Sequence, residues 1–459
     1  MLRLGIRFKQ LLLVTGDLII FQVALVLTLL LRYGHVEQSA WDLHALPFGI
    51  VSMIWVVGSY VAGLYDFNVL KNGIKFFRLY LEGMIANLAT ALAFFYLIPI
   101  FGIEPRTNLF LYFAIVLLLG YGWRLGYNRL IANTLFKNRV LFIGSGMDAA
   151  KIRTMLERSA FGFHLVAVLE TTPNSRFEDS EVAWYSSLGD IEKIINDRNI
   201  HTILLGHKPD DIPGLRDALY KTLFLPVTLL DRTALEETIT GRIPLEYVSQ
   251  TWFLEHLREN EKAWYEMAKR IGDILMAIPF GIITLILYPI VALIIKISSP
   301  GPVLYSQIRL GKFGKQFRIW KFRTMHVNAE KNGPQFTADA KTDPRLFAAG
   351  RVLRRLRIDE FPQIWNVLRG DLSFIGPRPE RPEFVEQLTE RMPYYSLRHL
   401  TRPGLTGWAQ VRFLTPTASL EDNLKKLQYD VYYIKHRSPL LDMAILLKTI
   451  AIVLRRQGT

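Results

Sequence analysis

Two adjacent acidic residues, Asp359 and Glu360, are the first group in the sequence whose types and spacing could do chemistry. They follow three arginines within 354–357 and stand just before Pro362, where an apolar stretch with helical spacing begins. An acidic residue at such a place is a common helix N-cap. A helix N-terminus beside arginines can also bind an anion, and two carboxylates can share Mg²⁺ with a substrate phosphate while one attacks phosphorus. These residues alone leave both interpretations open.

Four further clusters surround this acidic pair. They read Ser-Pro-Gly-Pro-Val at 299–303, Lys-Phe-Arg-Thr-Met at 321–325, Asp-Leu-Ser-Phe-Ile-Gly-Pro-Arg-Pro at 371–379 and Arg-Pro-Gly-Leu-Thr-Gly-Trp-Ala-Gln at 402–410. With Asp-Glu and an earlier Lys-Arg pair, they resemble the bacterial sugar transferase family, in its long form the polyprenyl glycosylphosphotransferases. These are monotopic phosphoglycosyl transferases of exopolysaccharide initiation. The resemblance covers about residues 269–459 and is specific, because many motifs recur in the same order.

The resemblance implies an undecaprenyl-phosphate sugar phosphotransferase. Such an enzyme moves a sugar 1-phosphate from a UDP-sugar to undecaprenyl (polyprenyl) phosphate and releases UMP, as the first membrane step of exopolysaccharide or capsule biosynthesis. By the same resemblance, Asp359 is the nucleophile of a covalent phosphosugar intermediate and Glu360 binds Mg²⁺. The residues expected to bind substrate phosphate are Arg354, Arg378, Lys321, Arg323 and Pro377.

Four N-terminal stretches, roughly 10–31, 46–64, 79–101 and 109–123, are apolar enough to span a bilayer with their flanks. They predict a four-helix transmembrane bundle over residues 1–130. Lys and Arg are most frequent before the first stretch, between the second and third, and after the fourth. The positive-inside rule therefore places both ends of the bundle in the cytoplasm of a bacterial inner-membrane protein.

A fifth apolar stretch, 271–297, follows Lys269 and Arg270 and contains Pro279 and Pro289. If it crossed the membrane, the basic run that follows it would lie outside, against the charge rule. A re-entrant helix that bends and returns to the same face satisfies both the charges and the prolines. A buried helix of a soluble domain is the alternative. Family members usually bend at a Ser-Pro pair, whereas this chain has a Tyr-Pro pair ending at Pro289, so the bend position stays open.

Between the membrane bundle and the catalytic part, residues 138–250 alternate strand and helix patterns. A buried strand over 138–143 leads into a turn with Gly144 and Gly146, and a second strand ends at Glu170. This order predicts a Rossmann-like, doubly wound parallel-sheet domain. The glycines could cradle a nucleotide phosphate with Glu170 on the ribose, or they could only form a tight turn. We expect a regulatory rather than a catalytic domain, followed by a mainly helical catalytic domain over 264–459.

The composition excludes several classes of protein. The chain has 459 residues, no cysteine, and 55 Lys plus Arg against 41 Asp plus Glu, a formal net charge of +14. Without cysteine there is no disulfide framework, thiolate nucleophile or Cys-ligated metal. We expect UDP-sugar, polyprenyl phosphate and membrane lipid as partners, no nucleic acid, and association with further copies and other polysaccharide-assembly proteins. The competing hypotheses are a membrane-bound nucleotide-sugar dehydratase or epimerase, whose Tyr-x-x-x-Lys pair is missing from the sheet domain over 138–250, and a non-enzymatic assembly scaffold.

Overall fold

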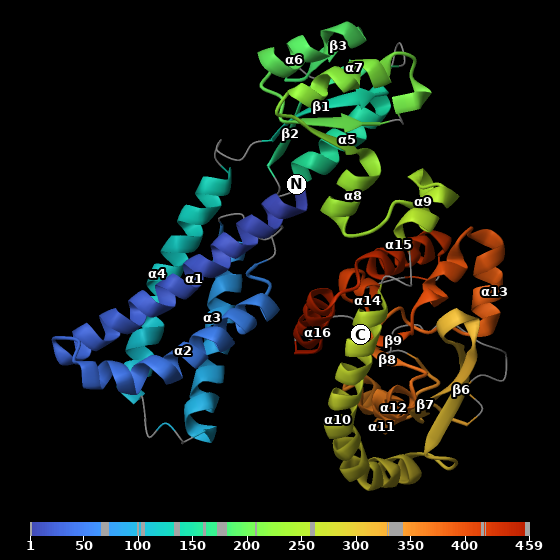
Figure 1. Ribbon diagram of the computed structural model, residues 1–459. Coiled ribbons are helices and arrows are strands. Elements are labelled where there is room, and N and C mark those ends of the chain that lie inside the picture. Colours follow the sequence, from blue (N-terminus) through green and yellow to red (C-terminus); the bar gives the residue numbers. More distant parts are fainter. Residues whose placement is uncertain are drawn as a thin grey trace. The chain divides into compact units, whose positions relative to one another are not determined.

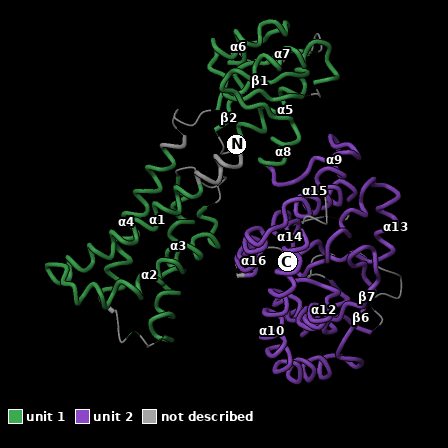
Figure 2. Tube along the Cα trace, viewed as in Figure 1, with its two compact units in different colours: residues 1–239 green, residues 240–459 purple. Residues whose placement is uncertain are grey.

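The structure is a computed structural model of the chain. It describes residues 2–65, 73–98, 101, 106–132, 138–158, 162–171, 181–206, 209–257, 262–327, 329, 343–414, 417 and 419–454. Three of the loop residues whose charges enter the orientation argument, Lys71, Glu104 and Lys137, lie outside this described part. The chain divides into two compact units, Met1–Ile239 and Thr240–Thr459 (Figure 2).

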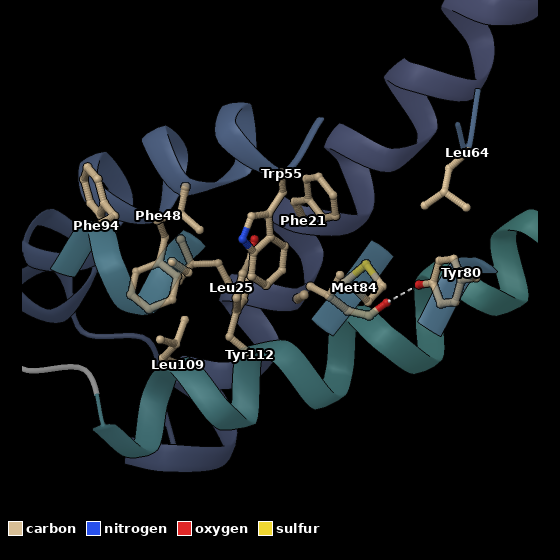
Figure 3. Packing of buried hydrophobic residues seen from close by; sticks show 14 of the residues in the cluster. Phe21, Leu25, Phe48, Trp55, Leu64, Tyr80, Met84, Phe94, Leu109 and Tyr112 are labelled. Carbon is tan, nitrogen blue, oxygen red and sulfur yellow. Dashed lines mark hydrogen bonds between the residues drawn. The ribbon is translucent and has the colours of Figure 1, made fainter. Parts of the chain in front are cut away.

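The first unit begins with long apolar helices that pack on one another. They are α1 (Leu2–Tyr33), α2 (Gln38–Val61), α3 (Ile74–Leu97) and α4 (Arg106–Ala132). Each contains a stretch of 23 or 24 residues long and apolar enough to cross a membrane. α1 packs against α2 and α4, and α3 packs against the same two helices. The core is aromatic: the rings of Phe48 and Trp55 lie 5.0 Å and 5.3 Å from that of Tyr112 (Figure 3).

Buried polar side chains also join these helices. Asp17 of α1 forms an ion pair with Arg124 of α4, and the Tyr65 hydroxyl donates to Asp17 Oδ2 at 2.7 Å. Asn87 Nδ2 of α3 donates to the Ser59 hydroxyl of α2 at 3.2 Å. Lipid offers no hydrogen bonds, so polar groups between apolar helices must bond to one another. Asp17 therefore has an explanation as a packing residue.

The remainder of the first unit is a parallel sheet, as the sequence predicts. Its strands are β1 (Asn138–Gly144), β2 (Phe163–Glu170), β3 (Ala183–Tyr185), β4 (Thr202–Leu205) and β5 (Thr228–Asp231), in the spatial order β3-β2-β1-β4-β5. The helices are α5 (Gly146–Arg158), α6 (Ile191–Asp197), α7 (Leu215–Lys221) and α8 (Arg232–Thr240). Leu141 of β1 packs with α6 and α7, whereas Phe142 packs with α5 and α8. Alternate strand residues thus bury both faces of the sheet under helices.

The second unit is mostly helical. Its helices are α9 (Gln250–His256), α10 (Ala263–Ser298), α11 (Ala348–Arg355), α12 (Ile364–Arg369), α13 (Pro382–Arg391), α14 (Trp408–Arg412), α15 (Leu420–His436) and α16 (Pro439–Leu454). An antiparallel hairpin joins β6 (Leu304–Leu310) to β7 (Gln316–Phe322), and β8 (Ser373–Ile375) pairs in parallel with β9 (Gly404–Thr406). The sequence analysis did not predict the hairpin.

The apolar stretch expected over 271–297 lies in α10, a 36-residue helix with Pro279 and Pro289 inside it. Figure 1 shows the carboxyl-terminal part of α10 turning away from the direction of its first part. Proline removes a backbone donor and is a usual cause of such a bend. Most of the side chains between the two prolines are exposed apolar groups, including Ile282 and Ile286, whereas Val291 and Ile295 are buried against the unit.

Candidate active site

The acidic pair lies in a 3-10 helix, η10 (Ile358–Gln363), that starts just after α11 ends. The residue between the two helices, Arg357, adopts the left-handed conformation with φ +58°. Such a conformation is uncommon outside glycine and costs about 1 kcal/mol or more. Arg357 precedes η10 directly, and Asp359 and Glu360 lie in the first turn of this helix.

Asp359 is buried, with 5% of its surface exposed. Its Oδ1 atom has no hydrogen-bond partner among the described residues. Burial, and secondly the charge of Glu360, raise the pKa of the Asp359 carboxyl to about 6, against the opposing effect of Lys321. A buried carboxylate oxygen without a partner is costly unless it serves a ligand or a reaction.

Glu360 lies at the centre of three cations. Its Oε1 atom is 3.1 Å from Lys321 Nζ, 3.4 Å from an Arg378 nitrogen and 3.9 Å from an Arg357 nitrogen. Burial acts to raise the pKa of Glu360, but these cations outweigh it and hold the pKa below its usual range. The neighbouring carboxylates therefore differ: Glu360 is held as an anion, and Asp359 exchanges its proton closer to neutral pH.

Lys321 reaches the pair because β7 is fastened to α12 through one buried amide. Asn366 is fully buried, and its Nδ2 donates to the Arg318 carbonyl at 2.7 Å while its Oδ1 accepts from Trp320 N at 3.2 Å. Each polar atom of the amide thus has a backbone partner on the strand that carries Lys321. Sequence reasoning did not single out Asn366. Its position three residues after Gln363 in a recognised motif was the available signal.

Arg378 is presented by the loop that follows β8, and close backbone packing fixes this loop. Pro377 is buried, and its carbonyl accepts from Gly404 N at 2.9 Å. A Cβ atom on Gly376 would meet the Arg402 carbonyl, and one on Gly404 would meet Gly376 N. Glycine is therefore required where the two motifs of residues 371–379 and 402–410 cross.

Two arginines, the buried Arg398 and the half-buried Arg309, hold the backbone of this loop. Arg398 donates to the Arg378 carbonyl at 3.0 Å and forms an ion pair of 2.9 Å with buried Asp430 of α15. Arg309 of β6 donates to the Pro379 carbonyl at 3.1 Å. Because these cations bind backbone carbonyls, they fix the path of the loop. The Arg378 side chain itself is held by its contact with Glu360.

The other two arginines expected to bind phosphate have different surroundings. Arg354 Nη1 is buried without a hydrogen-bond partner among the described residues, 3.8 Å from the Asp343 carboxylate, and Arg354 acts electrostatically on Asp359. Arg323 is buried and donates to the carbonyls of Ser299 and Pro300, each at 2.7 Å. Arg354 thus belongs to the charged surroundings of the pair, whereas Arg323 fastens the turn that follows α10.

Residues at the start of α10 tie this helix to the catalytic body. Lys269 Nζ donates to Asp442 of α16 at 2.8 Å, and Arg270 donates to the Val367 carbonyl at 2.6 Å at the end of α12. Asp273 accepts from the Ser373 hydroxyl at 3.0 Å and from Phe374 N at 3.1 Å.

After Pro289, α10 packs instead against Phe322 and Phe347. Both parts of α10 therefore contact the same compact unit.

An apolar groove of about 660 Å³ lies between α10 and the helices that follow the acidic pair. Ile278, Ile282 and Leu285 of α10 form one wall. Phe361 and Pro362, which come directly after Glu360, belong to its lining together with the half-exposed Trp365. The groove thus reaches the residues that follow the two carboxylates in the chain.

The glycines expected to bind a nucleotide lie at the carboxyl edge of the parallel sheet. Gly144 ends β1 in register with Glu170 of β2, and a Cβ atom on Gly144 would collide with the Phe142 ring. Gly146 begins α5. In the first turn of this helix, Asp148 accepts from the Ser145 hydroxyl at 2.9 Å and from Arg232 at 2.6 Å. The positive end of the α5 dipole therefore already faces a carboxylate of the chain itself.

The motifs of the second unit also occur in known proteins. The pattern that defines the bacterial sugar transferases matches residues 264–456. A UDP-glucose:undecaprenyl-phosphate glucose-1-phosphate transferase of Caulobacter vibrioides is 40% identical over 189 residues, 40% of this chain and 69% of the relative. The chain belongs to the bacterial sugar transferase family.

Two further members of this family differ in how much of the chain they match. The UDP-N-acetylgalactosamine-undecaprenyl-phosphate N-acetylgalactosaminephosphotransferase of Aeromonas hydrophila is 43% identical over 230 residues, 49% of this chain and about half, 52%, of the relative. A UDP-glucose:undecaprenyl-phosphate glucose-1-phosphate transferase of Klebsiella pneumoniae is 29% identical over 449 residues, 90% of each chain. The likeness to this bacterial sugar transferase thus extends through both compact units.

Proposed function

We propose that this bacterial sugar transferase moves a sugar 1-phosphate from a UDP-sugar to undecaprenyl phosphate, releases UMP, and catalyses the first membrane step of exopolysaccharide or capsule biosynthesis. The observation that carries the proposal is the buried Oδ1 of Asp359, which has no partner in the part of the chain that the structure describes, beside an anionic Glu360 held by three cations. The named relatives act on UDP-sugars and undecaprenyl phosphate, which supports the same two substrate classes here.

The proposed reaction has two displacements at one phosphorus atom. Asp359 Oδ1 attacks the phosphorus that carries the sugar, and the bond from this phosphorus to the bridging oxygen of UDP breaks, so UMP leaves with that oxygen. A phosphate oxygen of the lipid then attacks the same phosphorus, and Asp359 leaves as a carboxylate. No proton has to be removed from Asp359 once its carboxyl is ionised.

The cations around the pair have matching roles. Lys321 and Arg378 neutralise the phosphate charge that gathers in the transition state, and Arg354 stands on the side of Asp359. The described residues contain no group of three or more His, Asp or Glu side chains that could hold a metal ion. Mg²⁺ is usually held by one or two carboxylates with substrate phosphates, so the Glu360 carboxylate fits it while Asp359 Oδ1 attacks phosphorus. When bound, Mg²⁺ supplies further neutralisation of the pyrophosphate.

The membrane arrangement follows from the two substrates. We propose that α10 is re-entrant, that the helices α1 to α4 form a transmembrane bundle in the inner membrane, and that the catalytic unit faces the cytoplasm. Contacts of α10 with one body on both sides of its prolines support re-entry. The isoprenoid chain of the acceptor would lie in the apolar groove, whose lining reaches Phe361 next to Glu360.

The decisive experiment measures UMP release by the purified full-length chain with Mg²⁺, undecaprenyl phosphate and a panel of UDP-sugars that includes UDP-glucose and UDP-N-acetylgalactosamine. We expect release with one or a few of them. Without the lipid, labelled UMP should still exchange into the UDP-sugar, because the first displacement needs only Asp359. Asp359→Asn should abolish both reactions, and Glu383→Gln, on exposed α13, should abolish neither. No UMP across the panel, or exchange by Asp359→Asn, would overturn the proposal.

Re-entry is tested separately by single cysteines, since the chain has none of its own. Met267→Cys in α10 and Phe313→Cys in the turn between β6 and β7 introduce exposed thiols on the two sides of the prolines. In oriented membrane vesicles, both should react with an impermeant maleimide from the cytoplasmic face only. Labelling from opposite faces would show that α10 crosses the membrane.

A further inference from the structure

The loop that presents Arg378 is held through consecutive backbone carbonyls. The Arg378 carbonyl accepts from Arg398 at 3.0 Å. The carbonyls of the next two residues accept from Arg309 and from Leu310 N of β6 respectively, each at 3.1 Å. A loop has no regular ladder of hydrogen bonds, so bonds of this kind decide where the Arg378 side chain starts. The loop is thus supported from β6 and, separately, from Arg398.

Arg398 lies in η11 (Tyr395–Leu400), and its buried side chain joins this loop to α15. Its Nη2 atom donates to the Arg378 carbonyl and forms an ion pair of 2.9 Å with Asp430 of α15. Its Nη1 atom donates to the Tyr395 hydroxyl. Asp430 and Tyr395 are buried as well. Three groups of the second unit thus fix the direction of one guanidinium.

Asp430 is the group that lets Arg398 remain a buried cation. An isolated charge is costly to bury, and a carboxylate at ion-pair distance offsets that cost. Glu380, 3.8 Å from both Arg398 and Arg309, is a second carboxylate near these cations. Stability alone does not account for such a pair, since apolar side chains of similar shape often stabilise a fold as well. What the charged pair adds is a directed donor to the Arg378 carbonyl.

The other close cation at Glu360 has a support of its own. Lys321 lies on β7, which the buried Asn366 of α12 fastens through its amide. Arg378 meets the same Glu360 Oε1 atom from the loop after β8, at 3.4 Å. The two cations thus depend on different buried residues, so a change at one support can be distinguished from a change at the other.

We propose that Asp430 is a positioning residue for the transferase reaction and acts through Arg398 on Arg378. This inference rests on the proposed function, in which Arg378 neutralises the phosphates of the UDP-sugar. Asp430 does not itself bind the substrate. It keeps Arg398 charged and in place, and Arg398 holds the Arg378 backbone where the side chain can reach both Glu360 and a phosphate.

The test is a double-mutant cycle on UMP exchange by the purified full-length chain, at UDP-sugar concentrations well below KM. Asp430→Asn should lower the rate about tenfold to a hundredfold, because a misplaced binding group slows the reaction. In an Arg378→Gln background, the same change should have almost no further effect, because the cation that it displaces is already gone. In a Lys321→Met background, it should still lower the rate about tenfold. Glu421→Gln, at the exposed start of the same helix, is the matched control and should leave the rate unchanged.

A second pair of changes separates folding from positioning. Arg398→Met with Asp430→Leu replaces the buried ion pair by apolar side chains and should raise the midpoint of thermal unfolding above that of Asp430→Asn. The exchange rate should stay low, because the Arg378 carbonyl has lost its donor. If Asp430→Asn does not fold, this double change takes its place in the cycle. Recovery of exchange together with stability, or an equal loss with and without the Arg378 cation, would overturn the positioning role. No exchange by the unchanged chain would instead overturn the proposed function, and this inference with it.

Discussion

At the scale of single residues, the different roles proposed for Asp359 and Glu360 follow from their different surroundings. Three cations lie within 4 Å of Glu360 Oε1, whereas Asp359 has an oxygen without a partner in the described part of the chain. In the proposed reaction, the attacking form of Asp359 is the carboxylate. Its raised pKa of about 6 therefore sets an acidic limit to activity.

We predict that UMP exchange rises with pH through about pH 6 and then levels off, since only the ionised Asp359 attacks. Lys321 lowers the pKa of Asp359, so Lys321→Met should move this limb to higher pH as well as slow the reaction. The measurement is the exchange rate from about pH 5 to pH 8. Lys315→Met, exposed in the hairpin turn, should leave the limb in place. A limb that stays fixed or moves to lower pH in Lys321→Met would contradict the assignment.

The same carboxyl should limit stability. Its pKa in the folded chain lies above that of an unfolded one, so its contribution is fully present below about pH 4 and is lost as pH rises through about 6. Asp359→Asn should therefore raise the midpoint of thermal unfolding at pH 8, by an equivalent of about 3 kcal/mol, and by about half as much at pH 5. Thermal unfolding at both pH values checks this. A lower midpoint at pH 8, or a gain that does not depend on pH, would count against it.

At the scale of elements, the site depends on how β7 and α12 are joined. Asn366→Ala removes the hydrogen bonds to the Arg318 carbonyl and from Trp320 N and leaves both partly buried backbone groups without these bonds. We expect the folded state to lose about 2 kcal/mol or more, and UMP exchange to fall because Lys321 is no longer held at Glu360. Thermal unfolding and exchange rates measure the two effects. Gln387→Ala, on exposed α13, is the control, and equal behaviour of the two variants would refute the role of Asn366.

The sequence predicted the acidic pair, the long apolar helices and the parallel sheet because each has a local pattern. The hairpin of β6 and β7 also had one: two glycines, Gly311 and Gly314, separate two runs rich in aromatic and branched residues. The prediction instead used the basic charge of these runs. A local signal was present and was given the wrong weight.

Contacts between distant residues had no local pattern to reveal them. Arg398 and Asp430 pair across 32 positions, and Arg323 donates to the carbonyls of Ser299 and Pro300 and to the Ser299 hydroxyl. From sequence, an arginine that satisfies buried backbone looks the same as one that binds phosphate. Only the folded chain separates these two uses of the same residue type.

At the scale of the whole molecule, the second compact unit starts at Thr240, before the region that matches the family pattern at residue 264. Residues ahead of α10 belong to its core: Ile243 and Phe253 pack with Val385 and Leu427. The Gly241 carbonyl accepts from Trp408 Nε1 at 2.7 Å, inside the last of the family motifs. The segment 240–257 is thus structural support for the catalytic unit.

We predict that a fragment of residues 240–459 keeps UMP exchange, whereas a fragment of 264–459 unfolds at lower temperature and loses most of it. The second fragment lacks Ile243 and Phe253, and loss of a large buried apolar side chain costs about 2–5 kcal/mol. Thermal unfolding and exchange rates of the two fragments, each in the same detergent, make the comparison. Equal stability of both fragments would show that residues 240–263 do not support the fold.

The attachment of α10 at both of its ends fixes the position of its middle part relative to the active site. Arg270 and Asp273 bind the body that carries Asp359, and the helix returns to this body at Val291 and Ile295. In the re-entrant arrangement proposed above, the exposed apolar part between these attachments has a fixed length and enters the membrane to a fixed depth. The depth of this insertion, rather than the adsorption of the protein surface to the membrane, sets the level at which the attacking oxygen meets the lipid phosphates.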